Sequence, residues 1–421
     1  MDVDNSITEQ AKQAVAQYGT PLYLYYPHLI EQRISAVKSA TAGFGIRYAV
    51  KTNPNPWLLK WMQGRVESLD VSSAGEIKLA LDAGWTGDQL EFTGPAKTED
   101  DLSLALEVGI RSIVVEDISE LRILNQLAQQ QGKVSRVLVR IAPQLAEEKF
   151  GVRLAGRPTQ FGVDEDRLEE FFQHASELNN VYIEGLHIYS GSQCLDDKAL
   201  AEHFLALWNI FKKVITQLDR PVTELVFGAG MGIPYHDGDP ELTLSELPAA
   251  MDVIRREMTD LSSTLNCYVE VGRYLVGEAG LFLTRVVRIK ESRGTNIMLC
   301  DGGMNHNLGA CGHLGGVSHR HYSMQLLKNS GGVSHDVEEK HRYRVVGPLC
   351  TAIDTLALRV NLPLAEVGDL LAVGYAGSYG PTASPLYFIS HRLPKEVVCE
   401  VGEGPVEFKD VSWLPGQVEH N

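Results

Sequence analysis

The sequence RYAVKTNPNP (residues 47–56) is an apolar run that ends on Lys51 and then breaks into a turn of asparagine and proline. Asparagine and proline stop a strand and favour turns, so the run reads as a β-strand that delivers Lys51 to a loop. Lysine side chains are usually solvated. Lys51 is therefore a functional residue only if the rest of the chain builds a site around it.

Seven more short apolar runs repeat this pattern, and amphipathic helical stretches separate them. With the first run, they cover residues 46–51, 66–73, 90–94, 112–117, 136–142, 181–189, 224–230 and 267–273. Regular alternation of strand and helix predicts βαβ units and a parallel sheet. Eight such units predict a (β/α)8 barrel, and an open, doubly wound sheet is the alternative.

The pattern changes after the eighth run, where β-like runs are joined by glycine-rich turns without convincing helices between them. This texture predicts a separate all-β domain. We therefore expect a barrel over residues 31–278 and a C-terminal β domain over residues 279–421. Residues 1–30 are expected to contribute to the β domain. The polar, histidine-rich stretch 303–345 is expected to be a long loop.

Composition excludes several classes of protein. The 421-residue chain carries a formal net charge of −16, which disfavours a nucleic-acid partner. No apolar run approaches the roughly 20 residues that a membrane span requires, and the acidic N-terminus is unlike a secretory signal. The six cysteines are scattered without a CxxC pair, which indicates reduced thiols in a cytoplasmic protein and no cysteine-based metal site.

The expected barrel makes a test possible, because barrel active sites lie at the carboxyl ends of the strands. Polar and small residues collect there. They are Lys51, Asp70, Arg140, His187, Tyr189, Ser192, Gly228, Ala229, Gly230, Glu270, Gly272 and Arg273. The glycine-rich turn after the seventh strand suits a phosphate, since small residues let backbone N–H groups approach an anion. A tight turn alone also accounts for it, whereas a Rossmann motif would need a third glycine.

Glu270 is the sharper signal, because it lies on a strand that should face the barrel interior. A buried carboxylate is costly unless it is paired. A structural pair with Arg140 or Arg273 is one explanation, and a partner for a cationic ring nitrogen is the other. A reactive amine at Lys51, a phosphate cradle and such a carboxylate together describe a site for pyridoxal 5'-phosphate, on whose ring Tyr189 can stack.

The chain resembles the fold-type III pyridoxal-phosphate enzymes, and the diaminopimelate and ornithine decarboxylases in particular. The resemblance runs from Pro21 to Val397 and rests on the order and spacing of seven stretches. These are YAVKTNPN (48–55), LDVSSAGEI (69–77), GLHIYSGSQ (185–193), FGAGMGI (227–233), EVGRYLV (270–276), GPLC (347–350) and GSYG (377–380). It implies an alanine-racemase-like barrel followed by a β domain, and a homodimer with active sites at the interface.

The resemblance also implies roles for single residues. Lys51 stands at the position of the Schiff-base lysine, and Glu270 at that of the pyridine-nitrogen partner. Arg140 matches an arginine near the cofactor's phenolic oxygen. Cys350 matches a cysteine that the neighbouring subunit supplies to protonate the α-carbon; without the resemblance it reads as an inert thiol. Contacts around the phosphate fall on Ser192, Gly228, Ala229, Gly230, Arg273 and Tyr379.

Two departures from the family pattern bear on function. Tyr189 stands where the family usually has a histidine stacked on the cofactor, with His187 two residues earlier. Tyrosine can stack, but it cannot act as an acid or base near neutral pH. Decarboxylases of basic amino acids carry an acid directly after the cysteine, whereas this chain has Thr351, and Asp354 lies three residues further on. The distal end of the substrate is therefore expected to be neutral or anionic.

The histidine-rich stretch favours the same kind of substrate. It includes His306, His319 and His321, which we expect to contact a carboxylate-rich substrate from a lid. A solvated polar loop is the plain alternative, and no spacing of these histidines indicates a metal site.

These features resemble decarboxylases of siderophore pathways on the stretches 155–162, 185–193 and 347–351. We therefore expect α-decarboxylation of a citryl-amino acid, such as citryl-diaminopropionate or O-citryl-serine. HIYSGSQ and CDGGMNH also resemble decarboxylases that act on glutamyl groups held by acyl carrier proteins in antibiotic pathways. An acidic surface suits an acidic carrier poorly, so the sequence favours the siderophore substrate. Diaminopimelate or basic amino-acid decarboxylation and amino-acid racemisation are the remaining alternatives.

Overall fold

The computed structural model describes residues 4–145, 149–218, 221–261, 264–312, 320–329, 339–402 and 404–414. These residues form two compact units. Unit 1 takes residues 4–33, 233–240 and 273–414, and unit 2 takes residues 34–232 and 241–272.

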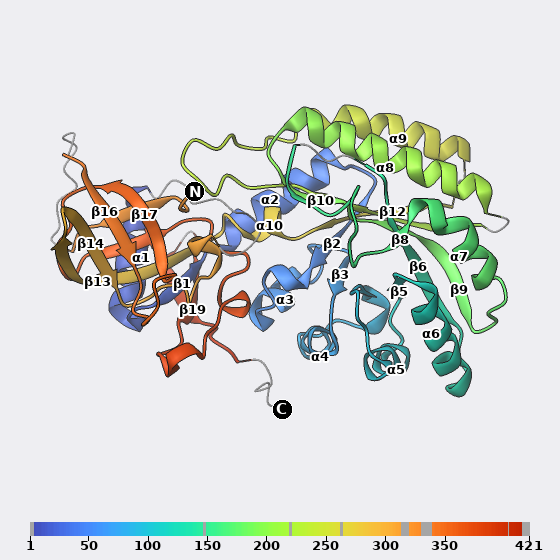
Figure 1. The fold of residues 1–421 in the computed structure, drawn as a ribbon, viewed down its shortest axis with the longest axis horizontal. Helices are drawn as coiled ribbons and strands as arrows, with labels where there is room; N and C mark the ends of the chain where they lie inside the picture. Colours follow the sequence, from blue (N-terminus) through green and yellow to red (C-terminus); the bar gives the residue numbers. More distant parts are fainter. Residues whose placement is uncertain are drawn as a thin grey trace. The chain divides into compact units, whose positions relative to one another are not determined.

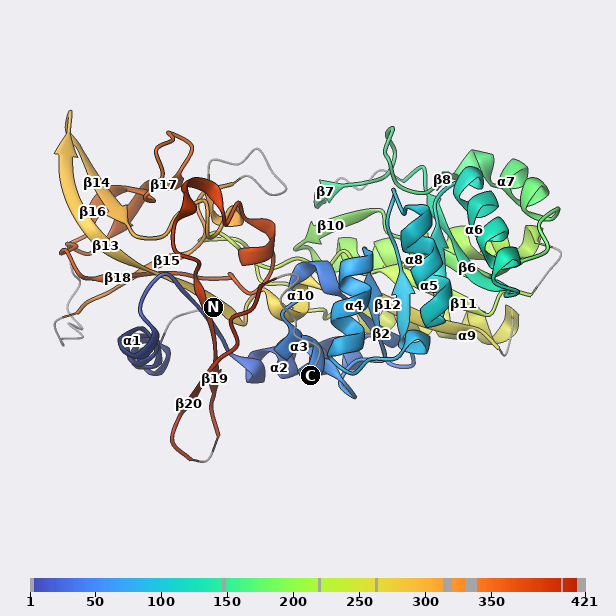
Figure 2. The same cartoon turned by 90° about the horizontal axis from the view of Figure 1, so that it is seen from below.

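Unit 2 is built on a closed barrel of eight parallel strands (Figures 1 and 2). They are β2 (Gly45–Ala49), β3 (Ser68–Val71), β4 (Leu90–Phe92), β5 (Ser112–Val115), β6 (Ser135–Ala142), β9 (Val181–Ile188), β11 (Glu224–Gly228) and β12 (Asn266–Val271). The order is β5-β4-β3-β2-β12-β11-β9-β6, and pairing of β5 with β6 closes the ring. All eight predicted runs are therefore strands of one barrel, and the open sheet is excluded.

Helices connect the strands around the outside of the barrel, as βαβ crossovers require. They are α3 (Pro56–Met62), α4 (Ala74–Asp82), α5 (Glu99–Val108), α6 (Ile118–Gln130), α7 (Leu168–Ala175), α8 (Asp197–Gln217) and α9 (Leu247–Leu261). Local sequence sets where they begin: Ser73 caps α4, Thr98 and Asp101 form a capping box on α5, and Asp117 caps α6. Figure 1 shows α8 and α9 running side by side.

Short elements complete unit 2; one lies directly before β4, and the others follow the carboxyl ends of barrel strands. They are η1 (Val50–Thr52), η2 (Gly87–Gln89), β7 (Phe150–Arg153), β8 (Val163–Asp164), η3 (Glu165–Arg167) and β10 (Gly191–Cys194). β10 pairs antiparallel with β7, and β8 extends the sheet beside β6. The barrel interior is packed with aliphatic side chains such as Val114, Leu138 and Val226, so it is a core and not a pore.

Unit 1 is a nine-stranded mixed sheet. Its strands are β1 (Leu22–Tyr25), β13 (Gly280–Ser292), β14 (Thr295–Cys300), β15 (Met324–Leu327), β16 (His341–Val346), β17 (Thr355–Leu362), β18 (Leu370–Val373), β19 (Lys395–Glu400) and β20 (Glu407–Asp410). The main path is β17-β16-β14-β13-β1-β19-β20, and β18 pairs with both β13 and β15. The N-terminal β1 thus lies between two C-terminal strands, antiparallel to β13 and parallel to β19.

Helices also belong to this part of the chain. They are α1 (Asn5–Tyr18), α2 (Pro27–Ala40), which crosses the boundary between the units, α10 (Arg273–Val276), and the 3-10 turns η4 (Gly309–Cys311), η5 (Pro381–Ala383) and η6 (Phe388–Ser390). α1 buries Ala11, Ala14 and Val15 in a cluster with Leu24, Leu283 and other aliphatic residues of the sheet. The β domain therefore carries a helix that its C-terminal sequence could not indicate.

The stretch 303–345 is not one continuous loop. It contains η4, the strand β15 and the start of β16. β15 forms because Met324, Leu326 and Leu327 are apolar and buried, and because the strand pairs with β18. The sequence did not predict this strand because it is short and polar residues surround it.

Candidate active site

Lys51 lies in the single turn of η1, directly after β2, at the carboxyl end of the barrel. Its Nζ atom is 3.1 Å from Oδ2 of Asp70 and 3.5 Å from Oε1 of Glu270. The lysine side chain is 40% exposed, whereas the two carboxylates are buried. The amine is thus partly exposed at the carboxyl end of the barrel and lies beside two buried acids.

Glu270, on β12, is buried beside the groups that stabilise its charge. Its Oε2 atom lies 2.7 Å from Nε2 of His187, on β9. Burial raises the pKa of a carboxyl group, but the charges of Lys51, His187 and Arg140 and the hydrogen bond from His187 outweigh burial and hold the pKa of Glu270 well below its ordinary value.

Asp70, on β3, responds in the opposite direction. Burial and the nearby charge of Glu270 raise its pKa, although Lys51 opposes them. Two carboxylates under one amine thus have their pKa values pushed apart, a pattern typical of sites that use one acid as a fixed anion.

Tyr189 provides an aromatic face beside the amine, with its ring centroid 5.8 Å from Nζ of Lys51. The turn after β11 packs closely behind this ring. A Cβ atom on Gly228 would come within 2.5 Å of the Tyr189 ring, and one on Gly230, whose φ is +65°, within 2.4 Å of Phe150. Both positions therefore require glycine for packing alone, as the tight-turn explanation states.

The same turn is tied to the site strand by its backbone. The N–H of Ala229 donates to the carbonyl of Glu270 at 2.9 Å. Ser192, on β10, is buried. A Cβ atom on Gly272, which follows β12, would come within 2.4 Å of Thr52. Small residues thus let three segments of the barrel mouth approach one another closely.

Arg140, on β6, brings in an acid that the sequence analysis missed. Its Nη1 atom lies 3.0 Å from Oε1 of Glu116, whose other oxygen accepts the N–H of Gly162 at 2.8 Å. The guanidinium also lies over the ring of Phe161, at 4.5 Å. Glu116 directly follows β5, so its position at a strand end was the signal that could have identified it.

A second buried charge layer lies deeper in the barrel and was also missed. Arg47 pairs with Glu91 and, at 2.7 Å, with Glu224. Burial raises the pKa of Glu91 to about 8 despite Arg47, with help from the nearby carboxylates. Ligand atoms of Glu91, His187 and Glu270 lie within 4.8 Å of one another, but Arg47 and Lys51 already supply positive charge to this cluster.

The remaining predicted cofactor residues belong to unit 1. Arg273 donates to the hydroxyl of Tyr235 at 2.7 Å, and its guanidinium lies 4.7 Å from the ring centroid of Tyr379. Tyr235 also lies 3.0 Å from Oγ of Ser378. The structure thus brings Arg273 and Tyr379 together.

Cys350 is exposed on a loop of unit 1 that also contains Thr351 and Asp354. Asp354 is buried, and its two oxygens accept the backbone N–H groups of Met304 and Leu349, each at 2.7 Å. The carboxylate therefore fastens the cysteine loop to the segment after β14 and does not project as an open acid.

The histidines of the expected lid lie in different surroundings. His306 is buried, its Nε2 atom lies 2.8 Å from the carbonyl of Arg392, and burial lowers its pKa. Its solvent-exposed lid position is therefore not observed, because Tyr23 and Arg392 hold it in the interior. Nδ1 of His321 lies 2.8 Å from the carbonyl of Tyr322. His319 lies outside the described residues.

A parallel barrel with a lysine at its mouth, an ionised acid beneath it and an aromatic face beside it defines a pyridoxal-phosphate enzyme. The family profile described as "Pyridoxal-dependent decarboxylase, pyridoxal binding domain" matches residues 28–277. The chain belongs to this family and is a pyridoxal-phosphate-dependent decarboxylase.

Relatives that match about nine-tenths of the chain are also decarboxylases. The chain is 29% identical over 392 residues to L-glutamyl-[BtrI acyl-carrier protein] decarboxylase of Niallia circulans, covering 92% of this chain and 90% of the relative. It is 30% identical over 396 residues to diaminopimelate decarboxylase of Aquifex aeolicus, covering 93% and 89%. The crystal structure of diaminopimelate decarboxylase from M. jannaschii with L-lysine superposes with a TM-score of 0.82 at 25% identity, covering 94% of this chain and 91% of that one.

The residues of unit 2 fit pyridoxal phosphate. An amine open to the barrel mouth, a fixed buried anion and an aromatic face are the groups that its aldehyde, ring nitrogen and ring require.

Among the described residues, no helix combines the length and the hydropathy needed to cross a bilayer.

Proposed function

We propose that this enzyme removes the α-carboxylate from a glutamyl group held by a carrier protein, a substrate whose distal end carries no positive charge. The loop of Cys350 supports a distal end without positive charge. By the family resemblance, Thr351 stands where enzymes that act on basic amino acids carry an acid. Asp354, three residues further on, has both oxygens bound to backbone N–H groups. A distal ammonium group would therefore meet no open carboxylate on this loop.

The cavity beside Thr351 supports an anionic or neutral group. It has a volume of about 500 Å³, and its lining includes Arg288, Arg344 and His391. Asp301 also lines it, but its carboxylate accepts hydrogen bonds from Thr20, Thr284 and the backbone N–H of Arg285. Asp354 also lines it, and both of its oxygens accept backbone N–H groups, so Arg288 and Arg344 are the charged groups of the lining that are left to meet a ligand.

The Niallia circulans relative, whose name specifies a glutamyl group on an acyl carrier protein, favours a carrier-borne substrate. The net charge of −16 argued against an acidic carrier. That argument treats the surface as uniform, whereas one face of unit 1 is strongly basic, as described below.

A citryl-amino acid of a siderophore pathway is the second candidate. Its carboxylates suit the arginines beside Thr351, since a guanidinium binds a carboxylate through two parallel hydrogen bonds. Both candidates share a distal end without a cation, and they differ in whether the substrate is a small molecule or is presented by a protein.

Each residue of the barrel mouth is assigned a separate contact with the cofactor. When bound, pyridoxal phosphate supplies a ring that accepts the electron pair left as carbon dioxide departs. Lys51 would hold the aldehyde carbon of the cofactor, and Glu270 would keep the proton on its ring nitrogen. Tyr189 would stack on the ring, and Arg140 would lie near the phenolic oxygen. The phosphate would be held by Ser192, Gly228, Ala229, Gly230, Arg273 and Tyr379.

Cys350 would complete the reaction by donating its thiol proton to the α-carbon. In this proposal the enzyme is a homodimer, and Cys350 serves the neighbouring subunit. The exposure of Cys350 supports a role outside its own core. All six cysteines are free thiols, which supports a cytoplasmic location.

The test is carbon dioxide release by holoenzyme, with mass spectrometry of the product. Glutamyl-loaded BtrI acyl-carrier protein, citryl-diaminopropionate, O-citryl-serine, lysine and diaminopimelate are offered in parallel. We expect turnover of the loaded carrier. Turnover of a citryl compound alone would replace the first candidate by the second, and turnover of a free diamino acid would overturn both.

A further inference from the structure

One face of unit 1 is basic although the chain is acidic. It lies on the four consecutive strands β13, β14, β16 and β17. Its cations, which we call the basic face, are Arg288, Lys290, Arg342, Arg344 and Arg359. None of the five forms an ion pair within the described residues. Arg344 donates a hydrogen bond to Oγ1 of Thr355 at 3.2 Å.

Strand register places these cations together. Lys290 is opposite Ile297, which is opposite Arg344, and Arg288 is opposite Leu299 in the neighbouring row. Because side chains alternate along a strand, Glu291 points to the opposite face from Lys290. Cations and half-buried aliphatic side chains thus share one surface.

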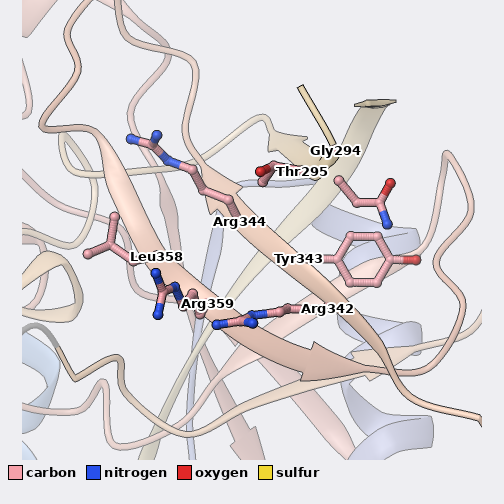
Figure 3. Close-up of a pocket in the computed structure, with 8 residues that line it drawn as sticks. Gly294, Thr295, Arg342, Tyr343, Arg344, Leu358 and Arg359 are labelled. Atoms are coloured by element: carbon pink, nitrogen blue, oxygen red, sulfur yellow. The ribbon is translucent and has the colours of Figure 1, made fainter. Parts of the chain in front are cut away.

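A β-bulge adds the fifth cation. The pairing of β16 with β17 shifts between Tyr343 and Val345, so that Arg344 is opposite two residues, Leu358 and Arg359. Both are exposed, which breaks the usual alternation along the strand. Figure 3 shows Arg342, Arg344 and Arg359 lining one cavity with Leu358; its volume is about 790 Å³.

Arg344 connects this cavity to the loop of Cys350. It lines both the 790 Å³ cavity and the 500 Å³ cavity that contains Thr351, the residue after the cysteine. A molecule held on the basic face would therefore lie next to the proposed site of the substrate's distal end.

We propose that the basic face docks an acidic protein that presents the substrate, which rests on the carrier-borne candidate above. A uniformly acidic partner is repelled by most of a chain with a net charge of −16 and attracted where the five cations lie, so charge alone orients it.

Other occupants fit less well. Exposed arginines are screened by water and contribute little singly, so a small anion gains little, whereas a protein gains from several contacts and from the aliphatic side chains. A nucleic acid is a long polyanion, and a chain with a net charge of −16 disfavours it wherever it extends past the face. β17 is also an edge strand, and its charges could serve only to prevent pairing with another strand, which requires no partner. The binding experiment distinguishes this explanation from docking.

The experiment measures binding of unloaded BtrI acyl-carrier protein to holoenzyme by fluorescence anisotropy at 20, 50 and 150 mM salt. The variant is Arg342→Glu/Arg359→Glu, because both side chains are exposed. The matched control is Lys409→Glu, an exposed cation on β20 at the opposite edge of the same sheet. We expect at least tenfold weaker binding by the double variant, a change within twofold for the control, and weaker binding as salt increases.

Absence of binding at 20 mM salt, or equal binding by the double variant, overturns the proposal. So does equal affinity for a DNA duplex, which would make the face a general polyanion site, or a change in oligomeric state of the double variant by light scattering, which would assign it to contacts between copies. Binding without turnover of the glutamyl-loaded carrier would leave the face standing and reject the proposed function. Equal turnover of the loaded carrier by wild type and double variant would support the proposed function and reject docking on the basic face.

Discussion

Nε2 of His187 lies 2.7 Å from Oε2 of Glu270, and both side chains are buried. Burial raises the pKa of Glu270, whereas Lys51 and the hydrogen bond from His187 lower it further than burial raises it. The histidine thus holds the acid in its ionised form from inside the barrel. His187 is on this account a positioning residue that acts through Glu270.

Replacing His187 should therefore change the pH profile and not only the rate. In His187→Ala the pKa of Glu270 rises, so the acidic limb of kcat/KM moves to higher pH. Because a hydrogen bond to a charged group contributes about 1.5–3 kcal/mol, we expect a loss of about 10–100-fold in kcat/KM at the acidic end of the profile and a smaller loss at pH 8. The measurement is kcat/KM and the absorbance of bound cofactor between pH 5 and 9.

His187→Asn is the control, because its amide can still donate a hydrogen bond to the carboxylate. It should retain more of the wild-type profile than the alanine variant. A loss of equal size at every pH in both variants would mean that His187 only fills space.

The barrel was predictable because its signal is local and repeated. Each apolar run, such as residues 46–51, ends where a turn begins, and polar or small residues collect at the same end of most strands. Lys51, Asp70 and Glu270 come from three strands, and the closed parallel order brings them together. The topology, once inferred, fixed their proximity without further information.

What the sequence did not indicate depends on contacts across long separations. Asp354 follows Cys350 closely and reads as a substitute acid, until the fold brings the backbone of Met304 to it. His306 reads as a lid residue, but it is buried among Tyr23 and Arg392. The basic face depends on strand register and a bulge, which neither net charge nor spacing indicates.

The buried acid Glu91 should make stability depend on pH. Burial raises its pKa to about 8 in the folded state, against about 4.3 in an unfolded chain. Between these values the folded state binds more protons than the unfolded state, so the free energy of unfolding falls as pH rises. Relative to Glu91→Gln, the wild type should therefore lose stability from pH 5 to pH 8, measured as Tm in a series of buffers.

Glu9→Gln serves as the control, since that side chain is 63% exposed on α1. Its Tm should follow the wild-type curve across the whole range. Parallel curves for wild type and Glu91→Gln would show instead that Glu91 does not take up a proton on folding.

Asp354→Asn should loosen the loop of Cys350. An amide offers one acceptor oxygen where the carboxylate offers two, so the N–H of Met304 or of Leu349 loses its partner. Leaving a buried donor unsatisfied costs about 1–3 kcal/mol. We expect a lower Tm by thermal denaturation and slower turnover. Ile353→Ala, at an exposed position of the same loop, should change stability by no more than about 0.5 kcal/mol; equal Tm values for the two variants would contradict this role of Asp354.

Thr351→Glu should shift the enzyme toward substrates with a distal ammonium group. The new carboxylate stands directly after Cys350, where the family resemblance places the acid of enzymes that act on basic amino acids. A charge-assisted hydrogen bond contributes about 1.5–3 kcal/mol. Arg288 and Arg344 line the same cavity and compete for the new charge, so we expect a gain of about tenfold, the equivalent of 1.4 kcal/mol, in kcat/KM for lysine or diaminopimelate. Thr351→Gln has the same length without the charge and should give no gain. If the glutamine variant gains as much as the glutamate variant, or neither gains, residue 351 does not select the distal end of the substrate.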